Sequence, residues 1–213
     1  RFFDVPCSQL LITHGDLKDR QRYINIKNTL RILLENRVLP VVNENDTVAT
    51  DELKVGDNDN LAALVALVSD ADCFIILSDV NGLYDQDPRV NANANLLPEI
   101  DEITPEVYAL AGTTNNHIAT GGMKTKLQAA EKAVDNGIVT YIVNGSESRV
   151  FDELLKGNNP GTRFNAKQGV NRARKHWLKH TLKSSGTIEL DHGAVQAVKS
   201  KGASLLSSGI VAS

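Results

Sequence analysis

The chain has 213 residues, of which 41% are hydrophobic and 23% are charged, with a formal net charge of -3. This composition is that of an ordinary globular protein and excludes a largely disordered chain. The negative charge gives no general attraction to nucleic acid or anionic membranes, and no apolar run approaches the ~20 residues that span a bilayer. We therefore expect a soluble, cytoplasmic protein in which Cys7 and Cys73 are buried free thiols.

A strand and a long helix are expected first. The apolar run "VPCSQLLIT", residues 5–13, has the length and composition of a buried strand. Asp16 can cap a helix from Leu17 to about Arg37, because a carboxylate accepts hydrogen bonds from the free N–H groups of a first turn. The residues at helical spacing that should share one apolar face are Ile26, Leu30, Leu33 and Leu34.

Strands and helices then alternate. "VLPVVN" and "CFIILS" predict the second and third buried strands, and the almost wholly apolar "NLAALVALVSDA" predicts a helix between them. A long polar loop runs from Asp79 to about Asp101. The elements predicted after it are a small helix at residues 104–112, a polar loop at 113–122, a helix at 123–137 ended by Gly137, a strand at 139–145 and a helix at 149–157.

This alternation of apolar strands and helices predicts a mainly parallel sheet covered on both faces, that is, a three-layer α/β/α sandwich. Ligands of such sheets bind beyond the carboxyl ends of the strands. Polar residues follow three predicted strands at this end, and we expect them to meet on one edge. They are Asn43 to Asp46, Ser78 with Asp79, and Asn144 with Gly145.

The pattern changes near residue 167, where "GNNPGTRFNAKQGVN" has no periodicity and marks a domain boundary. Residues 168–213 contain short strand-like pieces separated by Gly and Ser, which predict a small β-rich second domain. RNA binding is an alternative function for this part, through Arg172, Arg174 and Lys175. The negative net charge and the lack of aromatic residues accompanying the single Trp argue against it.

Residues 43–60, "NENDTVATDELKVGDNDN", collect six carboxylates and four side-chain amides around a single cation, Lys54. A charge run is usually a solvated face. Here small and apolar residues interrupt the acids, and apolar segments stand at both ends. The segment therefore predicts a binding site rich in hydrogen-bond acceptors.

Two further motifs could bind a nucleotide. Gly121 and Gly122 precede a predicted helix whose first turn carries Lys124 and Lys126, so backbone N–H groups and cations could bind a phosphate. Glycine also occurs at helix starts for steric reasons alone, which is the alternative. Asp79 ends the third strand, where it could approach a nucleotide or its metal ion, although an ordinary loop explains its motif equally well.

Histidines carry no such signal. They have no spacing that suits a metal site, and we assign structural or solvated roles to His14, His117, His176, His180 and His192.

Four motifs, in this order and with these separations, resemble the glutamate 5-kinase family: "PVVNENDTVAT", "KVGDNDNLAALVA", "LSDVNGLYDQDPR" and "ATGGMKTKLQAA". Members of that family phosphorylate the γ-carboxylate of glutamate with ATP in proline synthesis. The resemblance runs from about Leu10 to Gly157 and implies an amino-acid kinase fold for residues 1–167, while residues 168–213 resemble the start of a PUA domain. "DVNGLY" and "TGGM" also occur in aspartate and uridylate kinases, which leaves an enzyme of either type as the alternative.

The resemblance implies individual roles. Asp46 and Asn58 would hold glutamate, in a pocket shaped by Asn43, Glu44, Asp57 and Asp59. Lys126 would be the catalytic residue that stabilises phosphate charge, with Lys124 as its alternative. Mg²⁺ would accompany ATP and be held mainly by its phosphates. The residues that would contact the nucleotide are Ser78, Asp79, Thr120, Gly121, Gly122, Met123, Lys124, Thr125 and Lys126.

The family pattern also begins with a strand and a Lys- and Gly-rich segment that have no counterpart here. Loss of one charge-stabilising donor typically costs ~10²-fold or more in rate, so we expect a polypeptide that starts at Arg1 to be inactive. The loop from Asp79 to Asp101 leaves room for subunit contacts. We expect a homo-oligomer that binds L-glutamate and ATP. We expect no association with a membrane.

Overall fold

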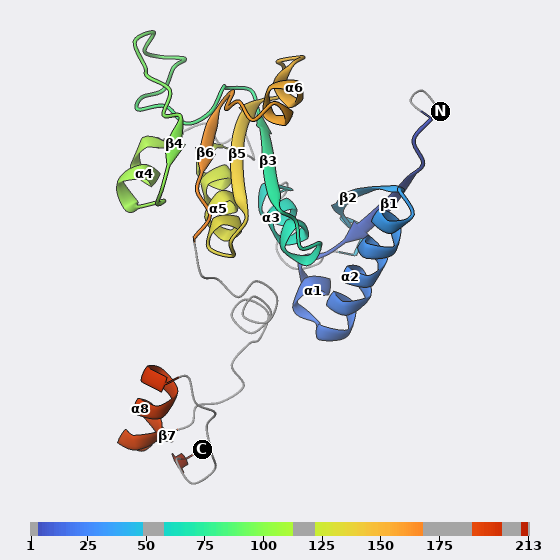
Figure 1. Ribbon diagram of the computed structural model, residues 1–213, viewed down its shortest axis with the longest axis vertical. Coiled ribbons are helices and arrows are strands. Elements are labelled where there is room, and N and C mark those ends of the chain that lie inside the picture. Colours follow the sequence, from blue (N-terminus) through green and yellow to red (C-terminus); the bar gives the residue numbers. More distant parts are fainter. Residues whose placement is uncertain (1–3, 49–57, 113–121, 168–188, 202–209, 213) are drawn as a thin grey trace. The chain divides into compact units, whose positions relative to one another are not determined.

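The computed structural model describes residues 4–48, 58–112, 122–167, 189–201 and 210–212 (Figure 1). They belong to two units, Arg1–Thr181 and Leu182–Ser213, which are treated separately below. The described elements of the first unit are β1 (Cys7–Ile12), α1 (His14–Lys18), α2 (Arg20–Glu35), β2 (Leu39–Glu44), α3 (Asn58–Val68), β3 (Cys73–Ser78), β4 (Glu99–Ile100), α4 (Pro105–Leu110), α5 (Met123–Val134), β5 (Val139–Asn144), α6 (Val150–Leu155) and β6 (Thr162–Phe164).

Two helices replace the single long helix that was predicted after β1. Thr13, not Asp16, caps α1, and Asp16 completes a capping box in which its carboxylate accepts hydrogen bonds of 2.8 Å from the backbone N–H and the hydroxyl of Thr13. Asp19 then interrupts the helix, because its backbone is extended and its side chain caps α2 by accepting from Arg22 N–H. The helical pattern continued through this break, so the sequence hid it.

The face predicted for the long helix is correct in part. Leu30 is buried and Ile26 packs against the same apolar cluster, which also contains Leu17, Leu61 and Val68. Leu34 is about half exposed, at 51%, and does not belong to this face.

The described strands of the first unit form two sheets where one was predicted. β1 and β2 pair in parallel, and the second sheet has the order β3-β5-β6-β4. Within the second sheet β3 is parallel to β5 and β4 to β6, whereas β5 and β6 are antiparallel. The α/β class and the mainly parallel pairing are therefore confirmed.

The core lies between the second sheet and two helices. α3 packs against α5, and Figure 1 shows both helices on one side of β3, β5 and β6. The buried residues at the centre of this layer include Ala63, Phe74, Leu127, Ile142 and Phe164. This packing fixes the N-terminal ends of α3 and α5, which carry the candidate site residues.

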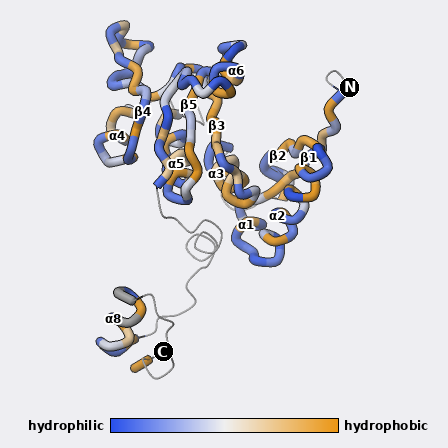
Figure 2. Tube along the Cα trace, in the orientation of Figure 1, coloured by the Kyte–Doolittle hydropathy of each residue, from blue (hydrophilic) through white to orange (hydrophobic). Residues whose placement is uncertain are grey.

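The prediction that both faces of every strand are buried was wrong for the described residues. Figure 2 shows that β3 is hydrophobic along most of its length, yet side chains alternate between the two faces of a strand. Phe74 and Ile76 are buried toward the helices, whereas Leu77 is 48% exposed on the other face. Cys7 and Cys73 are free thiols as predicted, but both are exposed because they lie on the uncovered face.

β6 was not predicted, because it lies in the stretch without periodicity that was interpreted as a domain boundary. Gly161 explains why the sequence pattern gave no strand signal: a Cβ at this position would overlap the carbonyl oxygens of Ile142 and Asn81. Glycine therefore lets the chain approach β5 closely enough for Thr162 to begin an antiparallel pairing with Ile142.

In the second unit β7 (Glu189–Leu190) pairs antiparallel with β8 (Ile210–Ala212), and α8 (His192–Lys201) lies between them in sequence. The helix was not expected in a region predicted to be β-rich. The β-rich domain and its boundary near residue 167 stay predictions, since residues 168–188 lie outside the described part. Among the described helices, none is both long and apolar enough to cross a membrane.

Candidate active site

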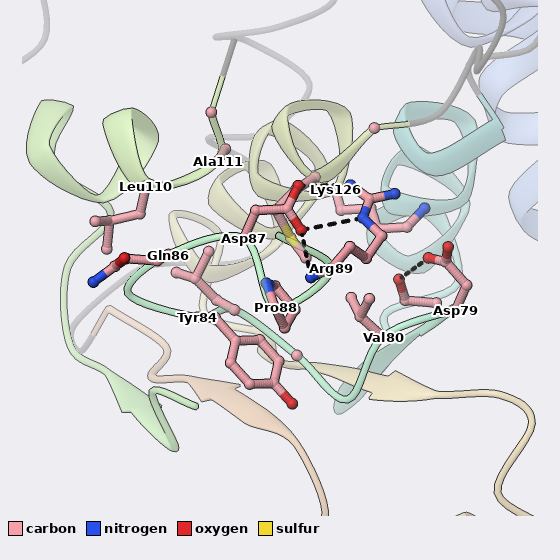
Figure 3. Close-up of a pocket in the computed structure, with 16 residues that line it drawn as sticks. Asp79, Val80, Tyr84, Gln86, Asp87, Pro88, Arg89, Leu110, Ala111 and Lys126 are labelled. Carbon is pink, nitrogen blue, oxygen red and sulfur yellow. Dashed lines mark hydrogen bonds and ion pairs between the residues drawn. The ribbon is translucent and has the colours of Figure 1, made fainter. Parts of the chain in front are cut away.

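A cavity of ≈ 250 Å³ opens beside the carboxyl end of β3, next to the N-terminus of α5 (Figure 3). Its apolar lining includes Val80, Leu83, Pro88, Leu110, Ala111 and Met123. Its polar and charged lining includes Ser78, Asp79, Gln86, Asp87, Arg89 and Lys126. A cavity with one apolar part and a few charged groups suits a ligand that joins an aromatic base to phosphates.

Five of the predicted nucleotide contacts line this cavity: Ser78, Asp79, Gly122, Met123 and Lys126. Thr125 lies beside Lys126 in the first turn of α5. Lys124 is exposed and does not line the cavity. Thr120 and Gly121 lie outside the described residues.

The N-terminus of α5 has the features of an anion site. Gly122 is its N-cap residue. Because glycine has no side chain, no N-cap side chain accepts hydrogen bonds from the free N–H groups of the first turn. The first turn holds no acidic residue, so the positive end of the helix dipole is not offset by a carboxylate of its own turn. These N–H groups could donate to a phosphate in the adjoining cavity.

An ion pair joins this turn to the start of α3. Nζ of Lys126 lies 3.2 and 3.0 Å from the two carboxylate oxygens of Asp59, and the Thr125 hydroxyl donates to Asp59 Oδ2 at 2.9 Å. The side chains of Lys126 and Asp59 are only 13% and 18% exposed. Asp59, predicted to shape the glutamate pocket, thus fixes the position of the lysine predicted to be catalytic.

Two asparagines of the acidic segment are hydrogen-bonded to each other near the start of α3. Asn58 Nδ2 donates to Asn43 Oδ1 at 3.2 Å, which connects the end of β2 to the start of α3. Asn58 immediately precedes Asp59, so the start of α3 is linked both to the end of β2 and to the first turn of α5. Asp46 is exposed in the turn after β2, and Asp57 lies outside the described residues.

One histidine has a partner that sequence reasoning missed. His14 Nδ1 lies 3.4 Å from Oε1 of Glu44, a residue predicted to shape the glutamate pocket. Thirty positions separate the two residues, and the parallel pairing of β1 with β2, which sets Ile12 opposite Glu44, brings them together. The regularity of strand pairing could have suggested this contact, but the histidine itself gave no signal.

The expected meeting of strand ends is confirmed for two strands. Gly145 N–H donates to the Ser78 carbonyl at 2.9 Å, and Asn144 Nδ2 donates to Asn81 Oδ1 at 3.0 Å. Asn43 lies near the end of β2, in the other sheet, and the hydrogen bond from Asn58 links it to the start of α3.

Sequence reasoning also missed a charged pair in the cavity wall. Asp87 Oδ1 accepts from the backbone N–H and from Nε of Arg89, at 3.0 and 3.1 Å, and Oδ2 accepts from Nη2 at 3.3 Å. Hydrogen bonds from Arg89 lower the pKa of Asp87, and the Asp87 carboxylate in turn raises the pKa of Arg89. The spacing in "DPR" was the available signal, because an Asp often accepts from the backbone two residues later.

Magnesium would find oxygen ligands here. Within the described ranges, no group of three or more His, Cys, Asp or Glu side chains could hold a metal ion on its own. Asp79 and Asp87 nonetheless line the cavity, and Mg²⁺ that arrives with a nucleotide is usually bound by phosphates plus one or two carboxylates. The residues present fit such an ion.

Comparisons with known proteins identify the family. The model of the amino acid kinase family matches residues 2–144. The chain is 56% identical over 211 residues to "Glutamate 5-kinase" from Idiomarina loihiensis, covering 99% of this chain and 57% of that protein. It is 53% identical over 212 residues to "Glutamate 5-kinase" from Salinibacter ruber, covering 100% of this chain and 56% of that protein.

The chain therefore spans little more than half the length of these curated relatives. Among solved structures, the crystal structure of UMP kinase from Ureaplasma parvum matches with a TM-score of 0.46 at 16% identity, over 65% of this chain and 52% of that one. The family match covers most of the first unit, including β3, the start of α5 and the residues between them. On this match, the chain belongs to the amino acid kinase family.

Proposed function

We propose that the whole protein is a glutamate 5-kinase, which transfers the γ-phosphoryl group of ATP to the γ-carboxylate of L-glutamate. The observation that carries the proposal is the start of α3, where Asn58 bonds to Asn43 and the adjacent Asp59 bonds to Lys126. It joins the segment suited to an amino acid to the cavity suited to a nucleotide. The names of the relatives support the same substrate.

ATP would occupy the cavity with its base among the apolar residues and its phosphates toward Gly122 and Lys126. The N–H groups at the start of α5 would donate to phosphate oxygens. Bound Mg²⁺ would neutralise phosphate charge and help to orient the γ-phosphoryl group. Asp79 and Asp87 are the described carboxylates placed to assist in holding it.

Glutamate needs acceptors for its ammonium group and donors for its carboxylates. Asp46 and Asn58 would supply both kinds of group, and Asn43, Glu44 and Asp57 belong to the same segment of the sequence. A γ-carboxylate oxygen would form a bond to the γ-phosphorus while the bond to the bridging oxygen of ADP breaks. The substrate is itself the nucleophile, so the enzyme needs no nucleophilic side chain and acts by positioning and by stabilising charge.

Lys126 would stabilise the charge that develops on the transferring group and on the leaving oxygen. Asp59 and Thr125 hold this lysine from the side of α3, so its ammonium is in place before the nucleotide binds. Preorganised charge of this kind stabilises a transition state more than a flexible side chain would.

The test is substrate-dependent turnover of the purified whole protein with Mg²⁺ and ATP. We expect ADP to form with L-glutamate, and hydroxylamine to trap the acyl phosphate product as a hydroxamate. L-aspartate and UMP serve as alternative acceptors, because aspartate and uridylate kinases share single motifs with this chain. Turnover with either of these compounds and none with glutamate would contradict the proposal.

A further inference from the structure

A glutamine amide lies at one end of the cavity. Figure 3 shows Gln86 with Leu110 at this end, and Asp79 with Lys126 at the other. The phosphates of a nucleotide belong at the end with the lysine, so the base would lie against the end that holds Gln86. A side-chain amide can pair with the edge of a purine base, because it presents one acceptor and one donor side by side.

Two hydrogen bonds in series set the orientation of this amide. The backbone N–H of Asn93, which can only donate, bonds to Asn91 Oδ1 at 2.9 Å. The nitrogen of the Asn91 amide is therefore the atom that faces Gln86, and it donates to Gln86 Oε1 at 2.5 Å. Both side-chain amides thus take their orientation from one backbone N–H group.

The segment that carries these side chains has its own internal bonds. The Asp85 carboxylate accepts from the backbone N–H and from Nδ2 of Asn95, at 2.8 and 2.9 Å, and Asp85 N–H donates to the Asn95 carbonyl at 3.0 Å. Asn91 N–H donates to the Asp87 carbonyl at 2.9 Å. Gln86 is the neighbour of both aspartates in sequence, so its backbone is held on either side.

The amide keeps free hydrogen-bonding capacity for a ligand. Among the described residues, none accepts a hydrogen bond from Nε2 of Gln86, and Oε1 retains a second lone pair beside the bond from Asn91. Adenine carries the acceptor N7 next to a donor, its N6 amino group, and this pair matches the amide. Guanine carries the acceptor O6 in place of the amino group, and O6 would lie against Oε1.

We propose that Gln86 selects adenine over guanine, with Nε2 donating to N7 and Oε1 accepting from the N6 amino group. Asn91 is the positioning residue that keeps the amide in this orientation, because reversal of the amide would break the hydrogen bond from Asn91 Nδ2. The inference rests on the proposed function, since it takes ATP as the occupant of the cavity. It adds recognition of the base to the proposed contacts with phosphate.

The experiment is calorimetric titration of the purified whole protein with Mg·ATP, Mg·GTP and Mg·7-deaza-ATP, in which a C–H group replaces N7. We expect the wild type to bind ATP about 10-fold more tightly than either of the other two nucleotides. Gln86→Ala should bind all three nucleotides with similar affinity. Gln21→Ala is the matched control, because Gln21 also bonds to an asparagine, Asn25, on the exposed part of α2.

A second variant tests the orientation alone. Asn91→Asp keeps an oxygen for the Asn93 N–H but cannot donate to Gln86 Oε1. The Gln86 amide should then reverse, so that its nitrogen donates to the new carboxylate and its oxygen lies against N7. We expect the ratio of ATP affinity to GTP affinity to fall about 10-fold although Gln86 is still present. A side chain that only stabilised the loop would weaken both nucleotides alike and leave this ratio unchanged.

The affinity ratio decides the outcome. A ratio equal to that of the wild type in either Gln86→Ala or Asn91→Asp would overturn the inference and leave the proposed function standing. Wild-type protein that binds GTP or 7-deaza-ATP as tightly as ATP would also overturn it. Wild-type protein that binds no ATP would remove the proposed function, and this inference with it.

Discussion

The carboxylate of Asp59 lies 3.0 Å from Nζ of Lys126 and accepts a further hydrogen bond from Thr125. One partner stands in the first turn of α3 and the other in the first turn of α5. Both side chains are mostly buried, so removal of either one leaves a charge that water compensates poorly. The same pair that joins the two helices therefore sets the position of the charge at the cavity.

Replacement of Lys126 should reduce turnover. We expect Lys126→Ala to lower kcat with a smaller effect on the KM for glutamate, because the ammonium acts on charge that develops in the transition state. Lys126→Arg should rescue poorly, since a planar guanidinium does not fit a space occupied by a compact ammonium. Steady-state kinetics of the whole protein would measure both effects; near-normal turnover of Lys126→Ala would favour Lys124 instead.

Replacement of Asp59 should act through Lys126. Asp59→Asn keeps the shape of the side chain but loses the charge that fixes the ammonium, so we expect a fall in kcat of about 10-fold or more. Asp70→Asn is the control, since it removes an exposed carboxylate that pairs with Lys27. An effect on glutamate KM alone would mean that Asp59 binds substrate and does not position the lysine.

Replacement of the proposed glutamate ligands should change substrate saturation. Asp46→Ala and Asn58→Ala are expected to raise the KM for glutamate far more than the KM for ATP, because a charged hydrogen bond to substrate contributes on the order of 1.5–3 kcal/mol. Asn25→Ala, on the exposed part of α2, serves as the control. Normal glutamate saturation in both variants would show that the substrate lies elsewhere.

The capping box of α1 should make stability depend on pH. Burial alone raises the pKa of Asp16, but hydrogen bonds from Thr13 and the Arg22 guanidinium outweigh it, so the pKa lies below its usual 3.8. A lowered pKa adds stability above pH 3.8, and this contribution is lost as the pH falls through the folded-state pKa.

Asp16→Asn should therefore lower the free energy of unfolding by about 1 kcal/mol at pH 7, with a difference from the wild type that shrinks in acid. Thermal unfolding followed by circular dichroism over a pH series would measure this. Glu35→Gln, which changes an exposed partner of Arg31, gives the comparison. A difference that stayed constant down to the lowest pH would exclude a role for the Asp16 charge.

The hydrophobic pattern of the sequence predicted the helices and strands that are determined by neighbouring residues. The apolar helix α3, the strand β3 and the end of α5 near Gly137, whose φ is 80°, all follow from periodicity and backbone preference. The interruption at Asp19 and the strand after Gly161 did not, because one is hidden by a continuing helical pattern and the other depends on close approach to β5.

Some features of the candidate site could also be predicted from the sequence, and others could not. Ser78, Gly122 and Lys126 could be placed at the cavity because strand ends and helix starts converge in parallel α/β folds. The pairing of Asp59 with Lys126 joins residues 67 positions apart and depends on the packing of α3 against α5, which no local pattern encodes. The place of the Asp87–Arg89 pair in the cavity wall was missed because it depends on the path of the long loop after β3.

Thr162 anchors both ends of the segment between Leu83 and Leu97 in the loop after β3. Its hydroxyl accepts from Leu83 N–H at 2.8 Å and donates to the Leu97 carbonyl at 2.7 Å, while Leu97 N–H donates to the Leu83 carbonyl at 2.8 Å. The two ends of the intervening segment are thus fastened to each other and to β6. Insertions or exchanges within residues 85–95 would change the wall of the cavity without displacing β3 or β6, so the shape and charge of the cavity could evolve here at little cost in folding stability.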